Sequence, residues 1–188
     1  MLKELFNEFI EFSMELRSEY PESLGLGKAT DDWTKVFNGL AEIPKLFEVI
    51  YSSVQGTKRE IKNQKLMDFI PGYRLIHFEE FIQEKKNIDI INSWPKGSLV
   101  LPLLVNYSSD YFCYVENFEG NSGLCLFMHD EGSLSLVYRS PEKFLKTIIE
   151  LYKQHAYYLD DEGYLDYDFQ KEGTIGGNLN FGVKYWSV

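Results

Sequence analysis

The sequence has few of the residues on which several common protein classes depend. Its 188 residues include only two cysteines and three histidines. Two cysteines are too few for a disulfide scaffold, and we expect both to be reduced. The histidines, His77, His129 and His155, are too widely spaced for a metal-binding pair on one helical turn. The composition therefore predicts neither a disulfide-stabilised domain nor a metal centre.

Basic residues and long apolar runs are also scarce. Lys and Arg number 19 against 29 Asp and Glu, which gives a formal net charge of −10. Nonspecific nucleic-acid binding requires a basic face that neutralises phosphates, so we expect no nucleic-acid partner. No run approaches the roughly twenty apolar residues that cross a bilayer, and residues 1–8 carry no secretion signal. We expect a cytoplasmic protein without membrane association.

The apolar content is sufficient for one globular domain. Hydrophobic residues make up 44% of the chain and aromatic residues 16%, whereas disordered chains of high net charge have few aromatics. A domain of this length buries roughly two thirds of the surface that its unfolded chain exposes, so it requires no metal or disulfide. We find no linker, repeat or low-complexity tract, and predict a single domain over residues 1–188, with an acidic C-terminal extension over about 157–188.

Helical patterns dominate the first half of the chain. Apolar residues recur at spacings of three and four over residues 2–16, and helices are also expected over 43–51 and 78–86. Thr30 is a candidate cap for a short helical turn. Tyr20-Pro21 is expected to end the first helix, because a residue before proline avoids helical dihedrals.

In the second half of the chain, the helical spacing of apolar residues gives way to short apolar segments. Four short apolar or aromatic segments are typical of strands: residues 99–105, 111–115, 124–129 and 134–138. Glycines 120 and 123 mark the turn after the second strand, and residues 130–133 mark the next. A closing helix follows Ser140, a natural N-cap, and the glycines at 25, 27 and 173–177 are interpreted as turn residues. The sequence predicts an α+β domain with helices flanking a central, mainly antiparallel sheet.

Two sets of residues have side chains that could take part in catalysis, the His129-Asp130 pair and the two cysteines, but for both a structural role is favoured. His129-Asp130 has the residue types of an imidazole oriented by a carboxylate, but ordinary turn residues follow it. Cys113 and Cys125 lie in apolar strands, where thiols pack as small hydrophobic groups. In a hairpin symmetric about residue 119 they face each other, with a reversible crosslink under oxidation as an alternative. With no nucleophile, phosphate loop or cofactor motif, we predict that the protein is not an enzyme and needs no cofactor.

The densest charge lies at residues 160–172, where six acidic residues and Lys171 give a net −5, half of the chain's charge. A calcium-loop register places Tyr158 and Phe169 at ligand positions and is disfavoured. Two interpretations stay open: a solvated acidic loop, or a recognition surface where tyrosines supply contact area and carboxylates steer a basic partner. In the second, the partner-binding residues are Asp160, Asp161, Glu162, Tyr164, Asp166, Tyr167 and Asp168.

Several short motifs occur in a characteristic order. They are Ile43-Pro44 opening a helix, Ile70-Pro71-Gly72 before a loop and helix, Leu101-Pro102-Leu103 on a strand, Ser109-Asp110 followed by the strand Tyr111-Phe112-Cys113-Tyr114, Leu126-Phe127-Met128-His129-Asp130 on the next strand, and Ser140 with Phe144-Leu145 opening the closing helix. This order resembles the SUKH superfamily of bacterial immunity proteins and fungal regulators of cell-wall synthesis. The resemblance covers about residues 43–186; the helix at 2–16 and the acidic C-terminal extension go beyond the shortest members.

The resemblance implies a SUKH-like fold and a function by binding, with no catalytic residues to assign. Members of this superfamily neutralise toxins, often nucleases, that are delivered between bacteria, or act as intracellular interaction modules. We therefore expect a non-catalytic immunity protein that binds a cognate, basic toxin domain. The alternative is an intracellular regulatory or scaffold protein without a toxin partner, related to the cell-wall synthesis regulators.

Overall fold

The computed structural model describes residues 1–28, 30–91, 94–118 and 120–187. The helices are α1 (Leu2–Leu16), α2 (Tyr20–Ser23), α3 (Lys45–Tyr51), α4 (Phe81–Ile91), α5 (Pro141–Lys153) and α6 (Phe169–Leu179). The strands are β1 (Arg74–Leu75), β2 (Leu99–Val105), β3 (Tyr111–Phe118), β4 (Asn121–Met128), β5 (Ser133–Tyr138), β6 (Tyr157–Leu159) and β7 (Leu165–Tyr167). Short 3₁₀ helices are η1 (Asp31–Phe37), η2 (Gln64–Leu66), η3 (Phe78–Glu80) and η4 (Lys184–Trp186).

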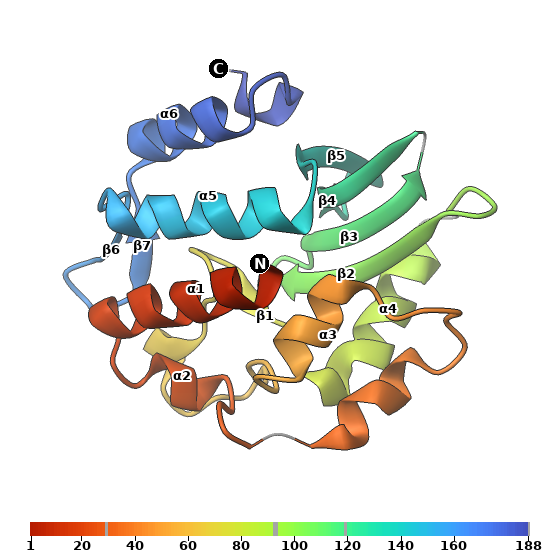
Figure 1. Ribbon diagram of the computed structural model, residues 1–188, viewed down its shortest axis with the longest axis horizontal. Coiled ribbons are helices and arrows are strands. Elements are labelled where there is room, and N and C mark those ends of the chain that lie inside the picture. Colours follow the sequence, from red (N-terminus) through yellow and green to blue (C-terminus); the bar gives the residue numbers. More distant parts are fainter. Residues whose placement is uncertain (29, 92–93, 119, 188) are drawn as a thin grey trace.

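The five strands β1 to β5 form one antiparallel sheet in chain order (Figure 1). Each strand pairs with the next. Strands β2 to β5 form the meander expected from short strands with short connections, whereas η3 and α4 lie between β1 and β2. The two remaining strands, β6 and β7, form a separate hairpin between α5 and α6. The α+β class and the antiparallel sheet predicted from the sequence are confirmed.

Neighbouring residues of β3 show which helix covers which face of the sheet. The Tyr111 hydroxyl donates a hydrogen bond of 2.8 Å to Glu84 of α4. The next ring, Phe112, lies 6.3 Å from Tyr138, which in turn contacts Phe144 of α5 at 5.2 Å between ring centroids. Because successive side chains of a strand point to opposite faces, α4 covers one face and α5 the other. Helix α1 packs side by side with α5 (Figure 1).

The capping predictions and the bounds of the first helix are confirmed, whereas the role expected for Pro21 is wrong. The helix predicted over 78–86 is a 3₁₀ turn, η3, followed by α4, which continues to Ile91. Ser140 accepts a hydrogen bond of 3.2 Å from the Lys143 amide at the start of α5, and Thr30 accepts one from Asp32 in η1. Helix α1 ends at Leu16, and Pro21 lies in the first turn of α2 instead of ending a helix. Proline fits there because a first-turn amide has no partner within the helix.

The glycines at 173–177 are not turn residues, contrary to the prediction, because they lie inside α6. Gly25 and Gly27 do occupy turns, at φ angles of +73° and +75°. Gly123 lies within β4, not in a turn, and an added Cβ there would approach the Tyr138 carbonyl oxygen to 2.1 Å. Its role is to let β4 and the end of β5 come close together.

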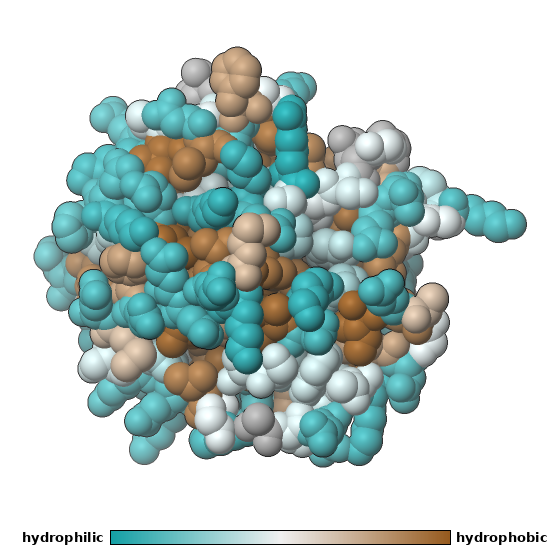
Figure 2. All heavy atoms as spheres, viewed as in Figure 1, coloured by the Kyte–Doolittle hydropathy of each residue, from teal (hydrophilic) through white to brown (hydrophobic). Residues whose placement is uncertain are grey.

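The face shown in Figure 2 is mostly hydrophilic, with hydrophobic side chains visible in patches around α1, α5 and α6 and also below α1, toward α3. Beneath them lies one continuous core that receives side chains from the sheet, the hairpin and most of the helices. In the described part of the chain, no helix has both the length and the apolar content needed to span a bilayer.

Candidate partner-binding site

The acidic segment forms an ordered hairpin instead of an open loop. In its register Tyr157 pairs with Tyr167, Tyr158 with Asp166 and Leu159 with Leu165. Cross-strand partners share a face, so Tyr157 and Leu165, both buried, point inward, whereas Tyr158 and Asp166 point outward. The Asp168 amide donates to the Ala156 carbonyl at 2.8 Å and fixes the base of the hairpin.

The carboxylates of this hairpin have different roles. Asp160 accepts hydrogen bonds from the Glu162 and Tyr164 amides, at 2.9 and 2.8 Å, and so shapes the turn. Asp168 accepts from two amides in the first turn of α6 and acts as its N-cap. Among the described residues, Asp161 and the side chain of Glu162 have no such partner, and both residues are exposed. These two are the carboxylates best placed to bind another molecule.

Aromatic rings flank the carboxylates on the outer surface. Tyr158 and Tyr164 are 39% and 41% exposed, and Phe169, which follows the hairpin, is 67% exposed. Lys65 Nζ lies 5.9 Å from the centroid of the Tyr164 ring and brings one positive charge to the turn. The seven predicted residues therefore share one small structure, but Asp160 and Asp168 also support its backbone, and Tyr167 shares the inward face of Tyr157.

Behind this inward face lies a pocket that the sequence did not reveal. It contains one carboxylate, Glu172 of α6, and aromatic rings from widely separated segments. The rings belong to Tyr73, Phe112, Tyr138, Tyr157, Tyr167, Tyr185 and Trp186. The density of tyrosines near the C-terminus was visible in the sequence, but the convergence of segments so far apart in the chain was not.

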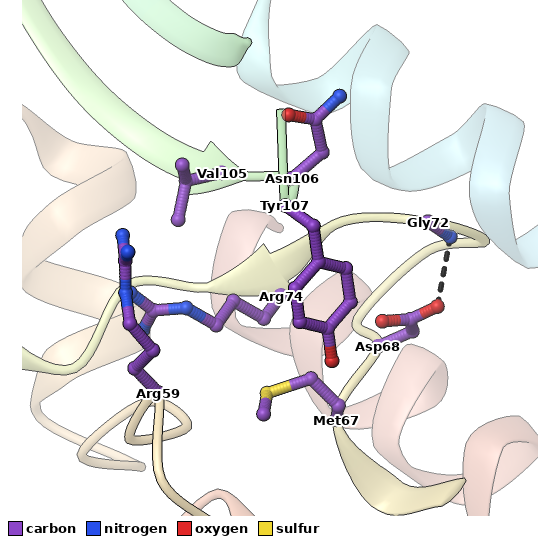
Figure 3. Close-up of a pocket in the computed structure, with 8 residues that line it drawn as sticks. All are labelled: Arg59, Met67, Asp68, Gly72, Arg74, Val105, Asn106 and Tyr107. Carbon is purple, nitrogen blue, oxygen red and sulfur yellow. Dashed lines mark hydrogen bonds between the residues drawn. The ribbon is translucent and has the colours of Figure 1, made fainter. Parts of the chain in front are cut away.

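A second, smaller pocket lies between η2, β1 and the end of β2 (Figure 3). Arg59 and Arg74 lie on one side of it and Asp68 on the other, with the Tyr107 ring between them. Its volume is about 40 Å³, which is room for about one water molecule.

The arginines of this pocket are already neutralised by acidic residues. Arg74, which is buried, lies 2.7 Å from Glu80 and 3.1 Å from Glu84, and Arg59 lies 2.9 Å from Glu84. Tyr111 and Asn87 also donate to Glu84. With its charges balanced internally, this cluster has the character of a structural network that joins β1, β3 and α4.

The imidazole of His129 lies between two carboxylates. Its Nδ1 is 3.1 Å from Asp110 and its Nε2 is 2.9 Å from Asp130. Burial alone would raise the pKa of Asp110, but hydrogen bonds from the His129 side chain and backbone, and from Asn106, lower it. Both ring nitrogens are engaged, so neither is free to take a proton from a nucleophile in this geometry.

Cys113 and Cys125 are directly opposite each other in β3 and β4, which confirms the predicted pairing. Residue 119, the centre assumed for the hairpin, lies outside the described residues. Both thiols are buried and reduced, and burial raises the pKa of Cys125 to about 12 and that of Cys113 further. Crosslinking requires a thiolate, so the intact fold disfavours it.

Comparison with known proteins gives no independent assignment: no protein-family model and no curated protein matches the chain. In the ranges 1–28, 30–91, 94–118 and 120–187, no three His, Cys, Asp or Glu side chains are grouped as metal ligands. The candidate site therefore rests on the hairpin and on the aromatic pocket behind it.

Proposed function

We propose that this protein is a non-catalytic binding module that engages a basic protein through the β6–β7 hairpin. The observation that carries the proposal is the ordered presentation of Asp161 and Glu162, exposed and without internal partners, beside exposed tyrosines. Carboxylates at the rim of an interface raise the association rate with a basic partner, and tyrosines supply contact area with little loss of side-chain entropy.

We propose further that the partner is the basic domain of a bacterial toxin and that the chain is an immunity protein of the SUKH type. The meander β1–β5 followed by α5 agrees with the segment order behind that resemblance and supports it. If the toxin is a nuclease, carboxylates that occupy the positions of substrate phosphates would block its cleft.

The test first looks for a toxin gene beside this one and, where there is one, measures association with its toxin domain, using wild type and a double variant, Asp161→Asn with Glu162→Gln. The variant should associate several-fold more slowly and show a weaker dependence on ionic strength, because local steering is reduced. A matched control, Glu11→Gln with Glu19→Gln, removes two exposed charges near α1 and α2 and should change the rate much less.

Equal rates in the two variants would place the interface away from the hairpin. A gene neighbourhood with only metabolic or cell-wall functions, and no binding to any adjacent gene product, would contradict the toxin assignment. That result would favour the regulatory or scaffold alternative.

A further inference from the structure

The pocket behind the hairpin combines aromatic walls with a single carboxylate. Its volume is about 80 Å³, enough for the head of one side chain or small ligand. Among the residues that the structure describes, Glu172 is the one charged residue that lines it. The rings come from the segment before β1, from β3 and β5, from both strands of the hairpin and from η4.

The walls are held in place by contacts with one another. Trp186 lies 5.0 Å from Tyr185 and 5.8 Å from Tyr138, between ring centroids, and its indole nitrogen donates to the Val137 carbonyl at 2.8 Å. On the other side, Tyr73 packs edge-on against Phe112 at 4.9 Å. The site is therefore largely preformed, which lowers the entropic cost of binding.

The entrance is open to solvent at two rings. Tyr167 and Tyr185 are 38% and 43% exposed, whereas Tyr138 and Tyr157 are buried. A ligand head that enters between the exposed rings would approach Glu172 while keeping its remaining atoms outside.

The carboxylate of Glu172 is not paired with a positive charge in the described part of the chain. No Lys, Arg or His of the described chain forms an ion pair with it. Burial raises the pKa of Glu172 to about 7, although a hydrogen bond from Tyr157 acts in the opposite direction. Removing a carboxylate from water without a counter-charge is unfavourable, so a cation from outside would relieve a cost already present in the fold.

We propose that this pocket binds one organic cation, and that in the complex proposed above it takes an arginine side chain of the basic partner. The second part rests on the proposed function, but the first does not. Aromatic faces attract cations, and a planar guanidinium stacks on rings while it pairs with a carboxylate. A lysine ammonium is more strongly hydrated and fits such walls less well.

The binding test uses ethylguanidinium chloride as the probe, with tetramethylammonium chloride and sodium chloride at equal ionic strength. The readout is the NMR signal of the Trp186 indole, which lies in the wall of the pocket. Ethylguanidinium should give a saturable shift, and Glu172→Gln, which keeps the shape of the side chain, should weaken binding about tenfold. Glu11→Gln removes an exposed charge on α1, outside the hairpin and the pocket lining, and should bind the probe as wild type does.

The pH dependence gives a readout that a structural role for Glu172 would not change. Affinity for ethylguanidinium should rise between about pH 6 and pH 8, as Glu172 loses its proton, and should stay flat in Glu172→Gln. The other titratable groups that line the pocket are tyrosines whose pKa is raised by burial, so they stay neutral throughout: Tyr73, Tyr138, Tyr157, Tyr167 and Tyr185. On the helix of Glu172 itself, the neighbouring charged residues are Lys171 and the N-cap Asp168.

Each outcome separates this inference from the proposed function. No saturable shift with either organic cation would overturn the cation pocket, whatever the hairpin binds. Tighter binding of tetramethylammonium than of ethylguanidinium would overturn the arginine assignment and point to a quaternary ammonium ligand. If the partner associates normally but dissociates faster from Glu172→Gln, the arginine assignment is supported; an unchanged dissociation rate would contradict it.

Discussion

Replacing Gly176 with alanine tests how closely α6 and η4 must approach each other. A Cβ added at Gly176 would lie 2.2 Å from two ring carbons of Trp186, where ordinary contacts are 3.4 Å or more. The ring cannot retreat freely, since its indole nitrogen is bonded to Val137. We therefore expect the clash to shift Trp186 and strain or break that bond.

The magnitude follows from two opposing effects. Overpacking a buried site costs about 1–3 kcal/mol and a lost buried hydrogen bond about 1 kcal/mol more. Alanine gains about 0.5–1 kcal/mol over glycine in a helix interior. The net expectation for Gly176→Ala is a loss of about 1–3 kcal/mol in the free energy of unfolding.

The matched control lies in the same helix. A Cβ at Gly173 meets nothing within 4 Å, so the only expected effect of Gly173→Ala is the higher helix propensity of alanine. It should raise the free energy of unfolding by about 0.5–1 kcal/mol. Urea unfolding followed by far-ultraviolet circular dichroism measures both, without relying on tryptophan emission. If the two variants are equally stable, the close approach of Trp186 to Gly176 is refuted.

Three further predictions concern carboxylates. Asp168→Ala should lower the free energy of unfolding by about 1 kcal/mol because it removes the N-cap of α6, whereas Asp161→Asn should change it by less than about 0.5 kcal/mol; equal losses in urea unfolding would contradict the cap. Glu84→Ala should lower the free energy of unfolding by about 3–5 kcal/mol, because Arg59 and Arg74 both lose the carboxylate that balances their charge. Glu79→Gln, at an exposed ion pair, should lower it by less than about 1 kcal/mol in the same assay. Glu172→Gln should stabilise the protein more at pH 8 than at pH 5: its folded pKa of about 7 exceeds its ordinary 4.5, so the native state holds more protons between those values and loses stability as the pH rises. An equal effect of Glu172→Gln at both pH values would show that its charge does not matter.

The sheet could be predicted from sequence because its signals are local. Strands β2 to β5 are short runs of branched and aromatic residues, and the turn at residues 129–132, predicted one residue later, separates two of them clearly. Strand β1 has only two residues and no periodicity, so nothing local marks it. Its position is set by pairing with β2 and by the ion pairs of Arg74.

Helix α6 shows where propensity misleads. Its three glycines disfavour a helix, yet one of them is what lets Trp186 pack against it. A usable local signal was present, because Asp168 is a favourable N-cap directly before the helix. Tertiary packing overrides the cost of the glycines, and that packing involves residues too distant in the chain for a pattern to reveal.

The candidate site was predictable only in part for a similar reason. Clustered charge located the hairpin, but charge counting gave Asp160 and Asp168 the same weight as Asp161, although the first two hold the backbone together. The aromatic pocket draws on residues from 70 to 186, so its assembly follows from topology alone.

The fold treats two of its shielded glutamates, Glu84 and Glu172, in opposite ways. Glu84 is surrounded by two arginines, a tyrosine and an asparagine, which compensate its charge. Glu172 is shielded by rings and receives one tyrosine hydrogen bond, with no cation near it in the described chain. Packing requirements alone would favour an apolar residue at that position, since a lone shielded carboxylate destabilises the native state. Such a local cost is expected where a ligand supplies the missing charge, and it is the physical reason for placing a cation in this pocket.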